Sequence, residues 1–241
     1  MAESTTWYTD DITLYSASSL WRTSRRQGII AGSLICLFFL FRKAIGWRFR
    51  PTYGTTLPDR LPIIPSEQIP PDVRDATATA LATCRDADMT VCFSTKPPYI
   101  GGRSGYSVVM LDRAGTTYAT AIWLRTTVGL STAENTMLSC HSLTSSGTEL
   151  HTGGVDPSVD MRLIMPGNDL LALPLDTPPE SVIAAHRERI VSRTDLVRFD
   201  SDSLSDHVMT AARRYLDWRI EQGYLVPLTP AEVHRLGGEQ A

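Results

Sequence analysis

The side chains in this sequence that could carry out chemistry are few and widely spaced. Cys140 and His141 are adjacent, an arrangement that suggests a cysteine nucleophile beside its base. In a β-strand, however, neighbouring side chains point to opposite faces of the sheet, so these two groups would not meet. The pattern therefore favours a core cysteine and a surface or edge histidine over a catalytic pair.

A small acidic cluster, Asp200, Asp202 and Asp206, precedes a strongly helical pattern. A calcium-binding EF-hand loop that began at Asp200 would need glycine at its sixth position and glutamate at its twelfth. The chain has Ser205 and Ala211 at those positions. We therefore interpret the cluster as helix capping and as stabilisation of the positive end of the helix dipole.

The segment 101–105, Gly-Gly-Arg-Ser-Gly, is rich in glycine, as phosphate-binding loops are. It lacks the Gly-Lys-Ser/Thr ending of a P-loop and the glycine spacing of dinucleotide-binding folds, and it joins two predicted strands. A flexible hairpin loop is the better interpretation. Arg103 in this loop is the candidate residue for contact with a partner.

The remaining reactive residues match no catalytic or metal-binding motif. The histidines at 151, 186, 207 and 234 are scattered singly, and the four cysteines lack the spacing of a zinc site. Neither His-Glu-x-x-His nor Gly-x-Ser-x-Gly occurs. We therefore expect no catalytic residue, no metal and no cofactor, while a site assembled from residues distant in the sequence stays open.

Composition describes a folded chain with an uneven distribution of charge. The 241 residues are 42% hydrophobic and 20% charged, as in globular proteins, and the net charge is −3. The segment 20–50 holds seven basic residues and no acidic one, so the rest of the chain carries −10, the difference between −3 and +7. An acidic domain is a poor partner for nucleic acid, whereas the basic segment suits anionic lipid headgroups.

The basic segment surrounds an apolar run that predicts a membrane anchor. Residues 28–41 carry no charge, but as a helix they would span only about 21 Å of a hydrocarbon core about 30 Å thick. Arg42 and Lys43 can extend their charged ends toward the headgroups, which allows the helix to continue. The prediction is a transmembrane helix over 28–47, with the lipid bilayer as one partner.

Trp21 and Trp47 flank this run, as interfacial aromatic residues do. Three alternatives are open: a cleaved signal peptide, for which no small-residue cleavage site follows, a buried core helix, and a helix embedded in one leaflet. Four basic residues follow the run closely and three precede it. The excess of positive charge places the C-terminal domain in the cytoplasm of a single-pass membrane protein.

The anchor divides the chain into a polar N-terminal tail at 1–27, the anchor at 28–47, a proline-rich linker at 48–70 and a soluble α+β domain at 71–241. Six prolines make the linker extended and fairly stiff. It is interpreted either as a spacer that lifts the domain off the bilayer or as a segment that packs along the domain surface through its leucine and isoleucine residues. The sequence does not separate these alternatives.

Periodicity within the domain predicts a helix over 71–87, then strands, then helices again. The strands are expected at 90–95, 106–111, 116–127, 136–143, 148–152 and 161–165. Their short connections predict an antiparallel meander of five to six strands. Helices are expected at about 177–192 and 203–222, with a short one after Thr229. One helix before and two to three after the meander define an α+β fold with helices over one sheet face.

These features lead to two hypotheses about function. The first is a membrane-anchored, non-catalytic binding or scaffolding module that engages another protein through a sheet edge or loop. The second is a membrane-tethered enzyme of undetected type, which predicts a concave pocket that collects polar residues with perturbed pKa values.

Overall fold

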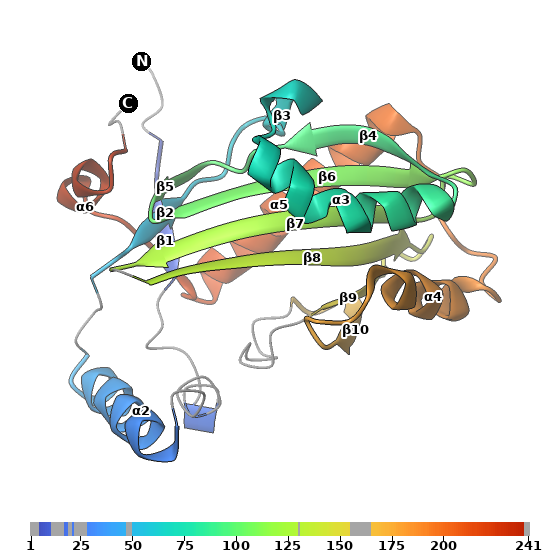
Figure 1. The fold of residues 1–241 in the computed structure, drawn as a ribbon. Coiled ribbons are helices and arrows are strands. Elements are labelled where there is room, and N and C mark those ends of the chain that lie inside the picture. Colours follow the sequence, from blue (N-terminus) through green and yellow to red (C-terminus); the bar gives the residue numbers. More distant parts are fainter. Residues whose placement is uncertain are drawn as a thin grey trace.

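The computed structural model describes residues 5–10, 17–18, 21, 28–46, 50–129, 131–154 and 165–238. It has a mixed α+β fold with one large sheet, one small sheet and several helices (Figure 1). The predicted fold class is confirmed at this level.

The large sheet has seven strands in the order β10-β9-β8-β7-β6-β4-β3. In chain order these are β3 (Ile63–Ile64), β4 (Met89–Thr95), β6 (Arg103–Asp112), β7 (Tyr118–Val128), β8 (Ser131–Leu143), β9 (Glu149–Gly154) and β10 (Asn168–Leu173). Neighbouring strands from β3 to β9 run antiparallel, whereas β10 runs parallel to β9. The predicted meander is therefore present, but its last strand differs.

The sixth strand was expected at 161–165, of which residues 161–164 lie outside the described residues. The strand that follows β9 is β10, Asn168–Leu173. A parallel pair needs a connection much longer than a hairpin turn, and the chain between Gly154 and Asn168 is long enough to provide one. The expectation of a purely antiparallel sheet was wrong at this edge.

Helices cover both faces of the large sheet. On one face α3 (Pro71–Asp86) and α4 (Pro179–Ile190) pack against buried residues such as Ala121, Trp123 and Leu138. On the other face lies α5 (Ser201–Glu221), seen behind the sheet in Figure 1. The prediction that helices cover one face was wrong, because β7 alternates apolar side chains toward both faces and each face needs a cover.

Capping residues explain where the late helices begin. Asp200 is the N-cap of α5 and accepts a hydrogen bond from the backbone N–H of Ser203, as expected for an acidic cluster that caps a helix. Thr229 caps α6 (Pro230–Arg235) together with Glu232. By contrast, α4 begins after the N-cap residue Pro178, which makes no side-chain hydrogen bond.

The small sheet brings together segments that are far apart in the sequence. Its strand order is β11-β1-β2-β5, built from β1 (Tyr8–Asp10), β2 (Tyr53–Thr55), β5 (Tyr99–Gly101) and β11 (Leu225–Pro227). The N-terminal tail and the proline-rich segment thus each contribute a strand. The proline-rich segment also carries β3, the 3-10 turn η3 (Ser66–Gln68) and the buried Ile69. Of the two alternatives for this segment, packing along the domain is the one observed.

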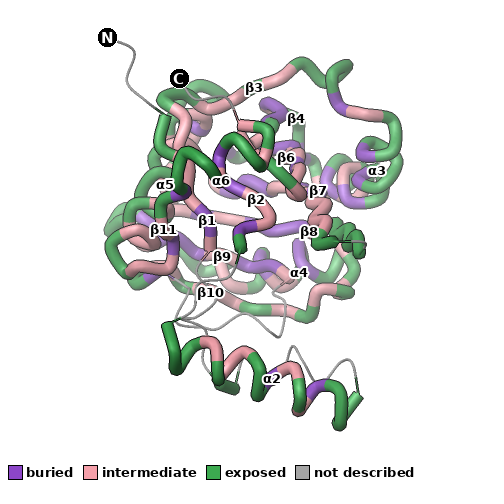
Figure 2. The backbone as a smooth tube through the Cα atoms, turned by 90° about the vertical axis from the view of Figure 1, so that its left-hand side faces the viewer, coloured by how far each residue is buried: buried purple, intermediate pink, exposed green. Residues whose placement is uncertain are grey.

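The apolar run forms α2 (Ile29–Ala44), which lies apart from the sheet in Figures 1 and 2. It has 16 residues, or about 24 Å of helix, against a hydrocarbon core of about 30 Å. In the part of the chain that the structure describes, no helix combines the length and the apolar character needed to cross a membrane. The predicted transmembrane span over 28–47 is therefore not supported.

The residues predicted to flank the anchor are only partly described. Arg42 and Lys43 lie in the last turn of α2. Trp21 is 36% exposed, and Trp47 lies outside the described residues. The alternative of a buried core helix does not hold for α2, because most of its large apolar side chains are exposed.

Candidate functional site

A cavity of about 460 Å³ lies between α5 and the large sheet. Val109 of β6 and Thr120 of β7 form its floor, while Val208, Ala212 and Leu216 of α5 line the opposite side. Cavities of about 300–1,000 Å³ with mainly apolar walls are the usual size for small-molecule sites. This cavity therefore has the dimensions and the lining of a ligand pocket.

Charged side chains line one part of the pocket. Asp10 of β1, Arg103 of β6 and Arg219 of α5 all contribute to its wall. Arg103 lies 4.0 Å from the Asp10 carboxylate, and Arg219 forms an ion pair with the same carboxylate. Two arginines thus share one carboxylate among the described lining residues, which leaves this part of the pocket with net positive charge.

Two tyrosine rings lie against the Arg103 guanidinium. Its central carbon lies 4.5 Å from the ring centre of Tyr53 and 5.3 Å from that of Tyr99, so both rings contribute cation–π attraction. Its Nε has no hydrogen-bond partner among the described residues. Burial raises the pKa of Tyr99 and of Tyr215, so both hydroxyls stay protonated at neutral pH and can donate hydrogen bonds. A positive, donor-rich pocket wall of this kind suits an anionic group.

Arg103 was expected in a flexible hairpin loop at 101–105. In the structure it is the first residue of β6, and its side chain lines the pocket instead of extending into solvent. Gly101 before it has a φ of 76°, a conformation that favours glycine, and it pairs with Tyr53 of β2. The glycines therefore allow the chain to pass from β5 to β6, and no phosphate loop is formed.

Cys140 and His141, the adjacent pair considered as a nucleophile and its base, point to opposite faces of the sheet. Cys140 is fully buried in the core under α3 and α4, while the neighbouring His141 points to the face covered by α5. The two side chains do not meet, and Cys140 is a core residue as expected, but His141 is mostly buried on a central strand and is not the surface or edge residue that was predicted. Among the described residues, no group of three histidine, cysteine, aspartate or glutamate side chains is arranged to hold a metal ion.

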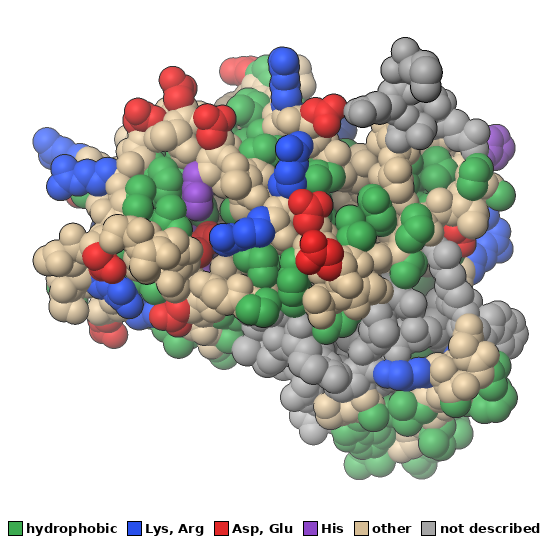
Figure 3. Space-filling model, turned by 180° about the vertical axis from the view of Figure 1, so that it is seen from behind, with side chains coloured by type: hydrophobic (Ala, Val, Ile, Leu, Met, Phe, Trp, Pro, Cys, Tyr) green, Lys and Arg blue, Asp and Glu red, His purple; other side chains and the backbone are tan. Residues whose placement is uncertain are grey.

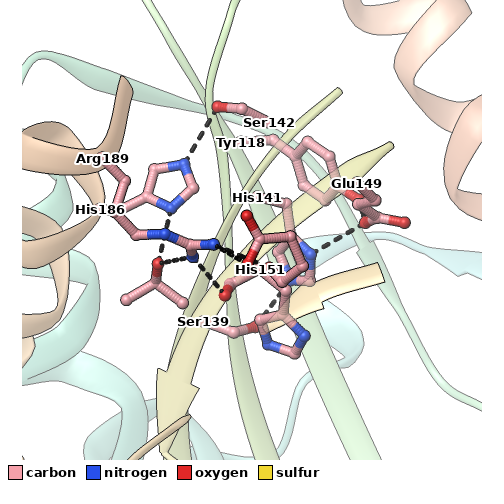
Figure 4. Close-up of polar contacts among 10 residues, drawn as sticks. Tyr118, Ser139, His141, Ser142, Glu149, His151, His186 and Arg189 are labelled. Atoms are coloured by element: carbon pink, nitrogen blue, oxygen red, sulfur yellow. Dashed lines mark hydrogen bonds and ion pairs between the residues drawn. The ribbon is translucent and has the colours of Figure 1, made fainter. Parts of the chain in front are cut away.

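His141 instead forms the centre of a polar chain that the sequence analysis missed. Its Nε2 lies 2.9 Å from the hydroxyl oxygen of Ser139, and its Nδ1 lies 3.0 Å from Oε1 of Glu149 (Figure 4). Tyr118 donates its hydroxyl hydrogen to the same glutamate oxygen at 2.6 Å. Serine, histidine and carboxylate therefore stand in the order that nucleophilic catalysis uses.

Burial and hydrogen bonds together set the protonation states of Glu149 and Tyr118. Burial raises the pKa of Glu149, but hydrogen bonds and the attraction of His141, together with the hydrogen bond from Tyr118, lower it to about 2. Burial and the neighbouring Glu149 hold the pKa of Tyr118 well above its usual value. At neutral pH Glu149 is therefore an acceptor only, and both Tyr118 and His141 Nδ1 must donate to it.

Stacked rings hold His141 in place between two strands. Its ring lies 4.7 Å from that of Tyr118 on β7, nearly parallel at 5°, and 4.3 Å from that of His151 on β9. Burial and the neighbouring His141 lower the pKa of His151 to about 3, so that ring is neutral at pH 7. The orientation of His141 is thus set by ring contacts on two sides and by a carboxylate.

The polar chain around His141 lies beside the pocket, although Ser139, His141 and Glu149 do not line it. In the register of β7 and β8, the pocket-floor residue Thr120 is paired with Ser139, and Tyr118 is paired with His141. Directly paired residues on one face of an antiparallel sheet have Cβ atoms about 4.5–5.5 Å apart. Ser139 therefore lies one strand away from the pocket floor, on the same face of the sheet.

A second serine–histidine pair occupies the opposite face. Ser142 lies 3.0 Å from Nε2 of His186 on α4, and the other ring nitrogen lies 3.0 Å from the Thr152 hydroxyl (Figure 4). Arg189 donates to Thr152 at 2.8 Å. His186 lies on the buried face of α4 and is only 1% exposed. This pair has hydroxyl partners and no carboxylate.

Comparison with known proteins adds no assignment to either site. No protein-family model, no curated protein and no solved structure matches this chain. The function has to be argued from the pocket, the polar chain and α2.

The missed residues left a pattern in the sequence. Ser139 and His141 share the parity of one strand, as do Glu149 and His151 of the next, and the turn between them contains Gly147. Only the register decides that His141 faces His151. Scanning paired strands for polar residues of equal parity would have identified the group.

Proposed function

We propose that the protein is a membrane-attached binding module, in which α2 docks on a lipid bilayer and the pocket under α5 binds a small amphipathic anion. The pocket is the observation that carries this proposal. Its walls are mainly apolar, and its charged part presents Arg103 and Arg219 around the single carboxylate of Asp10. An apolar body with one anionic group complements both regions.

The membrane attachment rests on the exposed face of α2. Ile30, Leu34, Leu37 and Phe41 recur at helical spacing, and each is more than 60% exposed. Hydrophobic side chains also cover most of the visible surface of α2 at the lower right of Figure 3, with a basic side chain beside them. An apolar helix face next to basic residues favours insertion into one leaflet of an anionic bilayer.

The topology and the protein partner remain predictions. The distribution of basic residues around α2 favours a sheet domain on the cytoplasmic side. Recovery of a reproducible protein from gently solubilised membranes would support a scaffolding role beside the ligand-binding one.

Ligand-observed NMR on the full chain in nanodiscs tests the binding function. We expect octanoate to bind saturably and 1-octanol to bind more weakly, with empty nanodiscs as the blank. Arg103→Met removes the guanidinium while keeping most of the apolar stem, and we expect it to weaken octanoate binding about tenfold without affecting octanol. Arg113→Met, which removes an exposed arginine on the β6–β7 turn, is the matched control. Equal binding of octanoate by all three chains would refute the assigned pocket.

Vesicle flotation tests the membrane attachment separately. Leu37→Asp places a charge on the exposed apolar face of α2, which costs about 2.5–3.5 kcal/mol within hydrocarbon, so we expect at least about a tenfold loss of vesicle binding. Val191→Asp, at a position that is 83% exposed next to the end of α4, is the control. If the Leu37 variant floated with phosphatidylserine vesicles as the wild-type chain does, α2 would not be the docking element.

A further inference from the structure

We infer that Ser139, His141 and Glu149 form a hydrolytic site that cleaves esters of small amphipathic carboxylic acids, with Ser139 as nucleophile, His141 as general base and Glu149 as the residue that positions the histidine. This activity goes beyond binding, although its substrate would enter through the same pocket. It gives the enzyme hypothesis a specific set of residues.

The geometry of the three side chains is the first argument. A serine 2.9 Å from one ring nitrogen and a carboxylate 3.0 Å from the other provide a nucleophile, a base and an orienting group within hydrogen-bond reach. Ser139 and His141 lie two residues apart on one strand, so both project from the same face. Glu149 reaches His141 from the neighbouring strand β9.

The protonation state is the second argument. Glu149 accepts a hydrogen bond from Tyr118 and a second from Nδ1 of His141, because an ionised carboxylate has no hydrogen to donate. Nδ1 of the neutral imidazole then carries the hydrogen, and Nε2 presents its lone pair to the Ser139 hydroxyl. This is the tautomer that can remove the serine proton.

The surroundings of the nucleophile are the third argument: Ser139 packs closely against Gly153 of β9 on one side and is paired with the pocket residue Thr120 on the other. A Cβ atom on Gly153 would lie 2.9 Å from Cβ of Ser139 and 3.1 Å from Nε2 of His151. Gly153 has no positive φ, so the absence of a side chain, not backbone freedom, explains the glycine. Ser139 is 7% exposed, and its neighbour Thr120 opens on the pocket. The acyl group of a substrate on the pocket floor would approach Ser139 from that side.

The reaction needs only water as co-reactant. The Ser139 oxygen attacks the ester carbonyl carbon while its proton moves to Nε2 of His141. The carbon–oxygen bond to the alcohol breaks, and His141 returns that proton to the departing alkoxide. Water then attacks the acyl-serine, giving its proton to His141, and the acid leaves as Ser139 recovers its hydrogen.

Ser142 provides a matched control within the same strand. It also contacts a histidine, His186, at 3.0 Å, but it is fully buried, and the second nitrogen of that histidine faces the hydroxyl of Thr152. It lacks both the carboxylate and the neighbouring pocket. A reagent that recognises activated serines should therefore distinguish the two residues.

The test is covalent labelling of the full-length chain in nanodiscs with an octyl fluorophosphonate, followed by peptide mass spectrometry. We expect modification of Ser139, loss of at least about 100-fold in the labelling rate in Ser139→Ala and His141→Gln, and an unchanged rate in Ser142→Ala. Circular dichroism and a thermal melt confirm that each variant is folded. No labelling of the folded wild-type chain, or labelling that persists in Ser139→Ala, would overturn the inference.

Measuring ester hydrolysis and octanoate binding on the same variants tests the catalytic site and the binding pocket separately. We expect p-nitrophenyl octanoate to be hydrolysed by the wild-type chain and not by Ser139→Ala, while that variant still binds octanoate as the wild type does. Octanoate binding without ester hydrolysis in the wild type would reject the catalytic site and leave the binding pocket standing. Ester hydrolysis by a wild-type chain that does not bind octanoate would do the reverse.

Discussion

Two serine–histidine pairs lie on opposite faces of the same sheet, yet their surroundings differ. On the α5 face, Ser139 and His141 are backed by the carboxylate of Glu149 and lie one strand from the pocket floor. On the α4 face, Ser142 and His186 are enclosed in the core. A hydrogen-bonded serine and histidine are therefore not by themselves evidence of catalysis. The carboxylate and the access decide between a reactive site and a structural one.

The difference also appears in what each histidine contributes to folding. His186 fills a buried position between β8, β9 and α4, where both its nitrogens face hydroxyl groups. His141 is only partly buried and is held by ring stacking and by Glu149. We therefore expect changes on the α5 face to affect activity and changes on the α4 face to affect stability.

The largest effect should follow from Glu149→Gln. An amide can donate a hydrogen to Nδ1 of His141, which moves the imidazole proton to Nε2, where it points at Ser139 and cannot accept the serine proton. We expect the rate of p-nitrophenyl octanoate hydrolysis to fall about 10³-fold, as is typical when the orienting carboxylate is lost. Glu149→Asp should restore part of the rate with a shifted pH profile. A glutamine variant with the wild-type rate would remove Glu149 from the proposed site.

The next largest effect is expected on stability, from a change on the α4 face of the sheet. His186→Ala leaves a cavity and deprives Ser142 and Thr152 of their partner, so we expect a loss of about 3 kcal/mol in the free energy of unfolding. Urea denaturation at pH 7.5 measures this loss, with the exposed His234→Ala as a control that should change by less than about 0.5 kcal/mol. Fluorophosphonate labelling of Ser139 should persist in the folded fraction. A stable His186 variant that lost labelling would mean that the two faces are coupled.

Acid should destabilise the domain through its buried histidines. Burial, together with the nearby His141 and Arg189, lowers the pKa of His186 to about 3. The unfolded chain, with a histidine pKa near its ordinary value of 6.5, binds a proton that the folded chain does not. The stabilisation from a neutral His186 is therefore complete above pH 6.5 and is lost as the pH falls from about 6.5 toward 3.

Unfolding measured between pH 7.5 and 4.5 checks this expectation. Each pH unit below about 6.5 should cost about 1.4 kcal/mol for His186 alone. His186→Gln cannot titrate and should flatten the profile by that share, and His151→Gln should do the same on the α5 face, since the pKa of His151 is also about 3. Glu149, with a pKa of about 2, should contribute only below about pH 4.5. A pH-independent wild type would contradict the assignment of buried neutral histidines.

The elements were predictable from sequence, because periodicity is a local property. The helix patterns at 71–87 and 203–222 correspond to α3 (Pro71–Asp86) and α5 (Ser201–Glu221), and five predicted strands are present. The placement of α5 on the far face was not predictable in this way, because it depends on which of two apolar faces each helix covers. The β1 strand in the N-terminal tail is only three residues long, too short for any periodic pattern.

The candidate site was not predictable for a related reason. Its residues come from two strands joined by a turn, and each histidine looks isolated in the sequence. The pairing of His141 with His151, and the contact with Glu149, exist only in one register of β8 and β9. A shift by one residue would turn every side chain of β9 to the other face and dissolve the group.

The smallest effect tests whether the pocket and the polar chain are one site. Thr120→Val exchanges the hydroxyl on the pocket floor for a methyl group of similar size, next to Ser139 across the strand pair. If the ester carbonyl lies between these residues, loss of a nearby donor should slow hydrolysis a few-fold, up to about tenfold, without changing the stability. The control is Thr132→Val on the exposed part of β8, which should leave the rate unchanged. Valine keeps the pocket volume, so a change in rate would report on the lost hydroxyl. An unchanged rate in Thr120→Val would place the reacting carbonyl away from the pocket floor and would separate the pocket from Ser139. A reduced rate with unaltered octanoate binding would mean that the pocket and Ser139 belong to one site.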